Sequence, residues 1–139
     1  MASLIEGEGD EIAMLANASA LIFDVVPRLN WAGFYFVKGE ELTLGPFQGK
    51  PACTRLKVGK GVCGTAVESD ETVVVRDVHE FAGHIACDSA SNSEMVIPLH
   101  KGNGVYAVLD LDSPEFDRFE EIREVIEKTA FEIESALNK

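Results

Sequence analysis

Apolar positions at both ends of the chain recur with the three-and-four spacing of amphipathic helices. From Asp10 onward one such face comprises Ile12, Leu15, Ser19, Ile22, Phe23 and Val26, with the serine as its only polar member. Asp10 can cap the start of this helix, and Pro27 marks its end. A second face begins near Asp117 and comprises Phe119, Ile122, Val125, Ile126, Ile133 and Leu137. The pattern predicts a helix at each end of the chain, with residues 1–9 as a frayed tail.

Between these helices, short runs of aromatic and β-branched residues predict strands. They lie at residues 31–37, 42–44, 56–58, 72–75, 95–99 and 105–111. The last two form a hairpin around residues 101–104, glycine and proline at 45–51 predict a loop, and the glycine-bearing segment 59–64 opens a short helix. Residues 77–92 show no clear period, and connections of that length are usually functional.

The order of these elements predicts an α+β fold, with a central, mostly antiparallel sheet and both terminal helices packed on one face. A parallel nucleotide-binding sheet is disfavoured because strands and helices do not alternate. Gly59-x-Gly61 and Gly102-x-Gly104 lack the third glycine of a dinucleotide motif, so these glycines serve turns. The 139 residues fit one domain, 1–139.

Composition narrows the classes of function. With 46% hydrophobic residues the chain can bury a core, and its net charge of −12 argues against a nucleic-acid partner. No run approaches the ~18 apolar residues of a membrane span. The N-terminus lacks the basic start and apolar middle of a secretory signal, so we expect a cytoplasmic protein with reduced thiols.

Three cysteines, Cys53, Cys63 and Cys87, lie in or beside glycine-bearing loops. Their odd number excludes a complete disulfide framework within one chain. Each could be a small buried hydrophobe. Their place in irregular segments instead favours thiol–disulfide chemistry: Cys63 is expected at a helix N-terminus, which favours the thiolate, and Cys87 has His84 close by.

Zinc is the competing interpretation of the cysteines. Three thiolates could bind the ion together with one histidine: His79, His84 or His100. No two cysteines are two to four residues apart, as structural zinc sites usually require. We therefore expect no metal and no other resident cofactor.

Two acidic residues interrupt an apolar strand pattern near the C-terminus. The period of two places Asp110 and Asp112 on one face, opposite Leu109 and Leu111. They could mark a strand end in solvent, or Asp112 and Ser113 could cap the last helix. Alternatively they form a cradle for a cation, with Glu94 as a third member. For Glu94 to share their face, the hairpin needs a three- or five-residue loop or a β-bulge, unless Glu94 precedes the regular ladder.

The first strand carries aromatic residues on both faces. Trp31, Gly33 and Tyr35 share one face, while Phe34 and Phe36 take the other. Core packing accounts for the phenylalanines. The polar tips of Trp31 and Tyr35 also suit the wall of a small-molecule pocket.

Several segments together resemble the free methionine-(R)-sulfoxide reductases, which are stand-alone GAF domains. They are NWAGFY (30–35), LGPFQGKPAC (44–53), GVCG (61–64), DVH (77–79), GHIACDS (83–89), SE (93–94) and LDLDS (109–113). The resemblance spans residues 30–114, and both flanking helices fall where that family has them. It implies a single GAF-like domain.

The resemblance also implies an activity: reduction of the free amino acid methionine-(R)-sulfoxide, with thioredoxin as the external reductant and no other cofactor. In this family pattern Cys87 attacks the sulfoxide sulfur, Cys53 is the main resolving cysteine and Cys63 a second resolving or relay thiol. The substrate-binding residues would be Glu94, Asp110, Asp112, Trp31 and Tyr35. A homodimer is implied as well.

The three cysteines are compatible with this chemistry. A cysteine sulfenic acid condenses with a second thiol to form a disulfide, which an external dithiol can open. Acidic residues near Cys87 would raise its pKa, so activation by a bound substrate ammonium is expected. Two alternatives remain at this stage: a GAF domain that binds a small molecule without catalysis, and a cysteine redox sensor.

Overall fold

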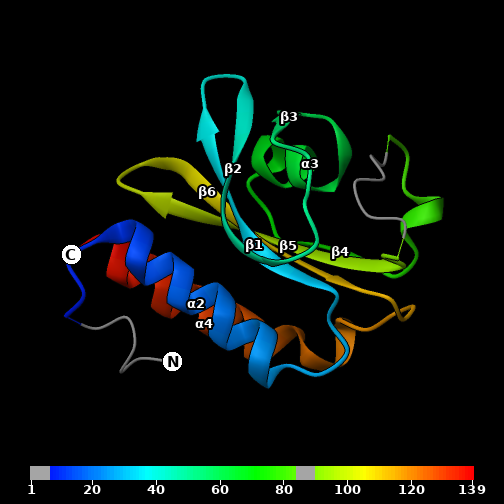
Figure 1. Ribbon diagram of the computed structural model, residues 1–139. Helices are drawn as coiled ribbons and strands as arrows, with labels where there is room; N and C mark the ends of the chain where they lie inside the picture. The colour runs from blue at the N-terminus through cyan, green and yellow to red at the C-terminus, as the bar shows by residue number, and fades with distance from the viewer. Residues whose placement is uncertain (1–6, 84–89) are drawn as a thin grey trace.

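Six antiparallel strands form one sheet in the order β3-β2-β1-β6-β5-β4 in the computed structural model, which describes residues 7–83 and 90–139. The strands are β1 (Trp31–Lys38), β2 (Glu41–Gly49), β3 (Arg55–Lys57), β4 (Val73–Val75), β5 (Ser93–Lys101) and β6 (Gly104–Ser113). Helices α2 (Glu11–Val25) and α4 (Arg123–Leu137) lie side by side on one face, and α3 (Gly61–Ser69) lies on the other (Figure 1). Short 3₁₀ turns occupy Val78–Glu80 and Glu120–Ile122. The predicted α+β class, antiparallel sheet and helical layer are confirmed.

The terminal helices differ from the prediction in their buried faces. Asp10 caps α2 as predicted, since its Oδ1 accepts a hydrogen bond of 2.9 Å from the backbone N–H of Ala13. Helical spacing places Ile12 and Val125 on the buried faces, but both are more than half exposed. The buried residues are Met14, Leu15, Ala18, Ser19 and Ile22 on α2 and Ile126, Ala130, Ile133 and Leu137 on α4. No helix among the described residues is long and apolar enough to cross a membrane.

The last helix begins later than predicted. The apolar spacing predicts a start near Asp117, but the φ of +50° at this residue lies in the left-handed region, which does not belong to an α-helix. A 3₁₀ turn then precedes Arg123, the first residue of α4.

Strand β2 is longer than predicted because it accommodates Gly45 and Pro46 at a bulge. Gly33 of β1 pairs with Phe47, whereas Tyr35 pairs with Leu44, so β2 carries one extra residue between these pairs. Proline has no N–H to donate, and a bulge is one of the places in a sheet that tolerate it. The predicted loop therefore begins only after Gly49.

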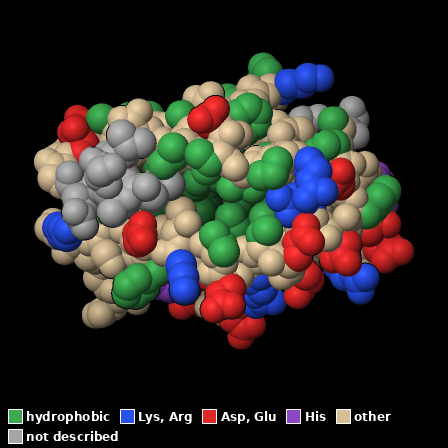
Figure 2. All heavy atoms as spheres, turned by 90° about the horizontal axis from the view of Figure 1, so that it is seen from below, with side chains coloured by type: hydrophobic (Ala, Val, Ile, Leu, Met, Phe, Trp, Pro, Cys, Tyr) green, Lys and Arg blue, Asp and Glu red, His purple; other side chains and the backbone are tan. Residues whose placement is uncertain are grey.

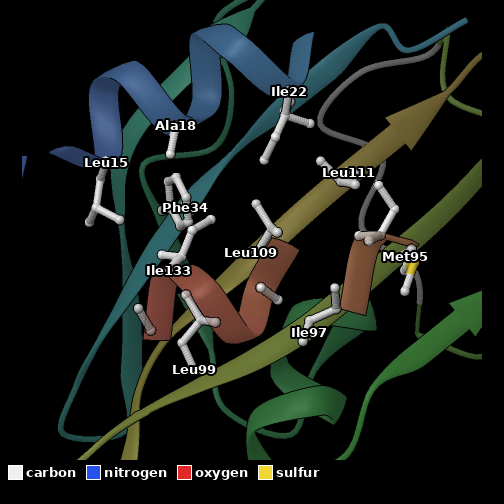
Figure 3. Packing of buried hydrophobic residues seen from close by; sticks show 14 of the residues in the cluster. Leu15, Ala18, Ile22, Phe34, Met95, Ile97, Leu99, Leu109, Leu111 and Ile133 are labelled. Atoms are coloured by element: carbon white, nitrogen blue, oxygen red, sulfur yellow. The ribbon is translucent and has the colours of Figure 1, made fainter. Parts of the chain in front are cut away.

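The two faces of the sheet bury two separate cores. The larger lies between the sheet and helices α2 and α4. Figure 3 labels ten of its residues: Leu15, Ala18, Ile22, Phe34, Met95, Ile97, Leu99, Leu109, Leu111 and Ile133. The smaller lies beneath α3 and includes Trp31, Tyr35, Val62, Cys63, Val96 and Val108. Successive residues of β1 and β6 thus alternate between the two cores, and the smaller core borders the candidate site.

Candidate active site

Three carboxylates converge on the α3 side of the sheet because of strand register. Glu94 on β5 pairs with Asp112 on β6, and directly opposed residues of an antiparallel pair point to the same face. Asp110 lies two residues before Asp112 on the same strand and therefore shares that face. We call Glu94, Asp110 and Asp112 the acidic cluster.

A β-bulge produces this register, and it was one of the predicted ways in which Glu94 can share a face with Asp110 and Asp112. The β5–β6 turn has only two residues, Gly102 and Asn103, which alone would send Glu94 to the other face. The pairing shifts by one residue between Leu99 and His100, and this shift restores the even register from Leu99 to Ser93. The predicted bulge is confirmed.

The acidic cluster is not a solvated strand end. Asp110 is 5% exposed and Glu94 is 7% exposed, while Asp112 is half-buried. The alternative that Asp112 and Ser113 cap the last helix is also wrong, because that helix begins at Arg123. Burial of ionised carboxylates is costly, so protonation, hydrogen bonds or a bound cation has to offset that cost.

Burial and mutual repulsion favour protonation of carboxyl groups in the acidic cluster. Burial, followed by the charges of Asp110 and Asp112, raises the pKa of Glu94 well above its usual value. Burial also raises the pKa of Asp110, against hydrogen bonds to Glu94 and Cys63 that lower it. Oδ1 of Asp110 is buried and has no hydrogen-bond partner in the described part of the chain. The pair therefore offers both a proton that can be donated and an acceptor without a donor.

Cys63 joins this cluster from the first turn of α3. Its Sγ and one carboxylate oxygen each from Glu94 and Asp110 lie within 4.8 Å of one another. The thiol is free and 4% exposed. Burial, then the charges of Asp110 and Glu94, raises the pKa of Cys63 well above its usual value. The prediction that the helix N-terminus favours a thiolate here is wrong, since burial beside two carboxylates outweighs the helix dipole.

The same three atoms are the only metal-ligand group found among residues 7–83 and 90–139. Zinc sites built by protein alone usually have four ligands. His79 instead contacts Asp77, and His100 lies between Asp70 and Glu134 at 2.6 Å from each, so neither joins Cys63. His84 lies outside the described residues. No histidine in the described part of the chain supplies a fourth ligand for a zinc ion at Cys63, Glu94 and Asp110.

An aromatic wall stands on the same face of the sheet. Trp31 pairs with Asp112 across β1 and β6, and its ring stacks on Tyr35 and on Phe47, with centroid distances of 5.9 and 5.2 Å. A Cβ on Gly33 would overlap the Cβ of Phe47 and lie 2.8 Å from Cη2 of Trp31. Glycine is therefore required at position 33 for the rings to stack.

The polar tips of two wall residues hold the loop that carries Cys53. Nε1 of Trp31 donates to the carbonyl of Lys50 at 3.1 Å, and the hydroxyl of Tyr35 donates to the carbonyl of Cys53 at 2.9 Å. Cys53 is half-buried and disulfide-bonded. Cys87, the predicted nucleophile, lies in the segment 84–89, outside the described residues.

The GAF domain family matches residues 10–137. The free methionine-R-sulfoxide reductase of Escherichia coli is 54% identical over 117 residues, which cover 84% of this chain and 71% of that protein. The chain belongs to the GAF-domain family of free methionine-R-sulfoxide reductases. The predicted family and GAF fold are thereby confirmed, and the chain is an oxidoreductase.

Two solved structures of this reductase family superpose closely. The fRMsr of Staphylococcus aureus in its reduced form has a TM-score of 0.94 and 52% identity, covering 98% of this chain and 89% of that one. The free methionine-R-sulfoxide reductase of Neisseria meningitidis, in complex with its substrate, has a TM-score of 0.93 and 40% identity, covering 98% and 83%.

The sequence analysis missed one member of the aromatic wall. Gly45 and Pro46 before Phe47 predict a loop, and no local pattern around Phe47 is typical of a strand. Its partner Gly33 was the available signal: a glycine between two aromatic residues on one strand face indicates close approach of another group.

Proposed function

We propose that this protein reduces free methionine-(R)-sulfoxide to methionine. The observation that carries the proposal is the buried acidic cluster beneath the aromatic wall, in which Oδ1 of Asp110 has no hydrogen-bond donor. An alkylammonium group supplies the missing donor and the positive charge. A substrate with one ammonium and a short thioether-like side chain fits carboxylates beside Trp31 and Tyr35. The relatives named as free methionine-R-sulfoxide reductases support this substrate.

The first chemical step is attack by the Cys87 sulfur on the sulfoxide sulfur. Methionine leaves with the sulfur electron pair restored, the oxygen passes to the cysteine as a sulfenic acid, and the cysteine is oxidised by two electrons. The reaction takes up no net proton, but its transition state places negative charge on the oxygen. The protonated member of the Glu94–Asp110 pair donates to that oxygen and recovers a proton from the thiol.

The second step is resolution by Cys53, which condenses with the sulfenic acid of Cys87 to form a disulfide and water. The half-buried position of Cys53, whose carbonyl is held on Tyr35, supports this role. Cys63 serves as a relay thiol, since its burial and raised pKa make it a poor first nucleophile.

Recycling requires an external dithiol, for which we propose thioredoxin in the cytoplasm. We further propose that the protein is a homodimer. The outer face of α2 and α4 supports this assembly: hydrophobic side chains gather there in Figure 2, and Ile12, Val25, Val125 and Phe131 are all more than half exposed.

The test compares free methionine-(R)-sulfoxide with its N-acetylated form in a thioredoxin assay that follows NADPH consumption. Acetylation removes the ammonium and leaves the acidic cluster buried without its cation. Loss of one member of a buried ion pair costs about 3–5 kcal/mol. The kcat/KM should therefore fall by about two to three orders of magnitude.

Asp110→Asn provides the matched control, because it should reduce kcat/KM for the free amino acid far more than for the acetylated one. Equal kcat/KM for the two sulfoxides contradicts the role of the acidic cluster. No sulfoxide-dependent NADPH consumption contradicts the catalytic proposal and favours a GAF sensor.

A further inference from the structure

One segment of the chain carries basic but no acidic residues, and the proposed reaction does not involve these basic residues. Between Leu42 and Val67 there are four basic residues and no acidic one: Lys50, Arg55, Lys57 and Lys60. The rest of the chain holds eight basic and all 24 acidic residues. One continuous segment, which contains both Cys53 and Cys63, is thus positive in a protein of net charge −12.

The structure gathers three of these cations on one surface. Arg55 and Lys57 lie on β3, which is an edge strand, and Lys60 precedes the first residue of α3. All three side chains are exposed and line one hollow of about 330 Å³, together with Glu41, Leu56 and Gly83. We call Arg55, Lys57 and Lys60 the basic rim.

The basic rim is not neutralised within the described part of the molecule. Elsewhere among the described residues, other basic side chains form ion pairs with carboxylates: Arg28, Arg76, Lys101, Arg118 and Arg123. For Arg55, Lys57 and Lys60 no ion pair forms with residues 7–83 or 90–139, and the Arg55 guanidinium instead donates to the carbonyl of Thr54 at 3.0 Å. Glu41, across the ladder from Lys57, is the single carboxylate among the described residues that line the hollow.

The rim is held at a fixed place relative to Cys53. Cys53 precedes Arg55 by two residues. The backbone between them is tied to two neighbouring strands: the Cys53 carbonyl accepts from Tyr35 of β1, and the Thr54 carbonyl accepts from the N–H of Leu44 of β2 at 3.1 Å. A protein that reaches the Cys53 sulfur from outside therefore approaches beside the rim.

We propose that the basic rim is the docking surface for an acidic face of the dithiol protein that reduces the Cys53 disulfide; this inference rests on the proposed function. Elsewhere the acidic surface of the chain repels such a partner, so the rim both attracts and orients it. In the exchange one partner thiolate attacks Sγ of Cys53 and expels the Cys87 thiolate. The partner's second thiol then attacks the mixed disulfide and expels Cys53. The partner leaves as a disulfide, having delivered two electrons, and its two thiol protons go to the two cysteines.

The experiment reverses two charges of the rim in the full-length protein, Arg55→Glu with Lys57→Glu. The matched control, Lys101→Glu with Lys139→Glu, changes the net charge equally at exposed positions at the end of β5 and at the C-terminus. Recycling is measured as kcat/KM for an acidic bacterial thioredoxin, at low ionic strength and in about 0.5 M NaCl, where the Debye length is below ~5 Å. Dithiothreitol, a small uncharged reductant, gives the second readout for every variant.

At low ionic strength the rim variant should lose about tenfold or more in kcat/KM for thioredoxin, and high salt should remove most of the difference. Its rate with dithiothreitol and its KM for the sulfoxide should stay unchanged, as should all values of the control variant. Glu41→Gln, which makes the rim more positive, should raise kcat/KM for thioredoxin. This gain separates an effect on docking from misfolding, because a misfolded variant would lose activity.

Equal losses in the rim and control variants overturn the inference, because net charge alone then explains the effect. A loss confined to the sulfoxide KM overturns it too, since the rim would then act on the substrate carboxylate. A changed oligomeric state with unchanged recycling also overturns it. If the unmodified protein fails to turn over with dithiothreitol, the proposed function fails instead.

Discussion

Glu94 lies directly across the β5–β6 ladder from Asp112, and a single residue maintains this relationship. The shift in pairing between Leu99 and His100 moves every residue of β5 before it by one position relative to β6. Without it Glu94 would face the helical layer formed by α2 and α4. The acidic cluster therefore depends on an irregularity located near the far end of the hairpin.

The cysteine assignments can be separated by single turnovers. Cys87→Ser should form no methionine even in one turnover, because it lacks the attacking sulfur. Cys53→Ser should form close to one equivalent of methionine and then stop, since the sulfenic acid cannot be converted to the disulfide that thioredoxin opens. Quenched-flow measurement of methionine, with the sulfoxide in excess over the protein, distinguishes the two.

Cys63→Ser is the control for these variants and should retain a full first turnover. Multiple turnovers by Cys87→Ser would disprove its assignment as nucleophile.

The buried Glu94 carboxyl should make stability fall as the pH rises. Its pKa in the folded protein is raised by burial, so the folded state holds the proton more tightly than the unfolded state. The stabilisation from that proton is complete below the usual carboxyl pKa and is lost as the pH rises through the raised pKa. The linkage slope is at most about 1.4 kcal/mol per pH unit for one proton.

Urea unfolding of the unmodified protein and Glu94→Gln, between pH 4 and pH 8 at about constant salt, checks this sign. The variant should gain relative stability with rising pH, whereas Glu124→Gln on the exposed surface of α4 should not. A constant difference between Glu94→Gln and the unmodified protein across this range would contradict a raised pKa.

Gly33→Ala should damage the aromatic wall. The new methyl group would overlap the Cβ of Phe47 and crowd the Trp31 ring, which forces β1 and β2 apart at the bulge. Overpacking of this kind costs about 1–3 kcal/mol of unfolding free energy. We expect a lower melting temperature together with a higher KM for the sulfoxide. An unchanged KM in a destabilised variant would show that the wall does not contact the substrate.

Tyr35→Phe should slow the resolving step more than the first step. It removes the hydrogen bond to the Cys53 carbonyl, whose net contribution to stability is about 0.5–1.5 kcal/mol, while the ring can still stack on Trp31. The burst of methionine should keep its amplitude, and disulfide formation measured by thiol labelling should become slower. Equal slowing of both steps would place the hydroxyl at the sulfoxide rather than at the loop.

Strand periodicity predicted the part of the site that depends on one segment alone. A period of two suffices to place Asp110 and Asp112 together, and Trp31 beside Tyr35, because side chains alternate whatever the strand pairs with. The register of Glu94 was predictable only as a condition on the hairpin. The turn residues could not show that a bulge meets this condition between Leu99 and His100.

The wrong predictions for Ile12, Val125 and Cys63 depend on contacts between distant segments. Ile12 and Val125 follow helical spacing, but which side of a helix is buried is decided by how it docks on the sheet. Cys63 does occupy the first turn of a helix, as predicted. Its proximity to Glu94 and Asp110, which suppresses the thiolate, arises from the packing of α3 on β5 and β6 and has no local signature.

Alternation along β6 gives this reductase an uneven tolerance to mutation. Even-numbered positions 110 and 112 belong to the acidic cluster, and odd-numbered positions 109 and 111 anchor the helical layer. Substitutions at positions 109 to 112 should sort by parity, with positions 110 and 112 losing turnover in proteins that still fold and positions 109 and 111 losing soluble protein. Deletion of one residue between positions 109 and 112 would turn the residues on one side of the deletion to the opposite face of the sheet, so it should damage the protein more than any single substitution there.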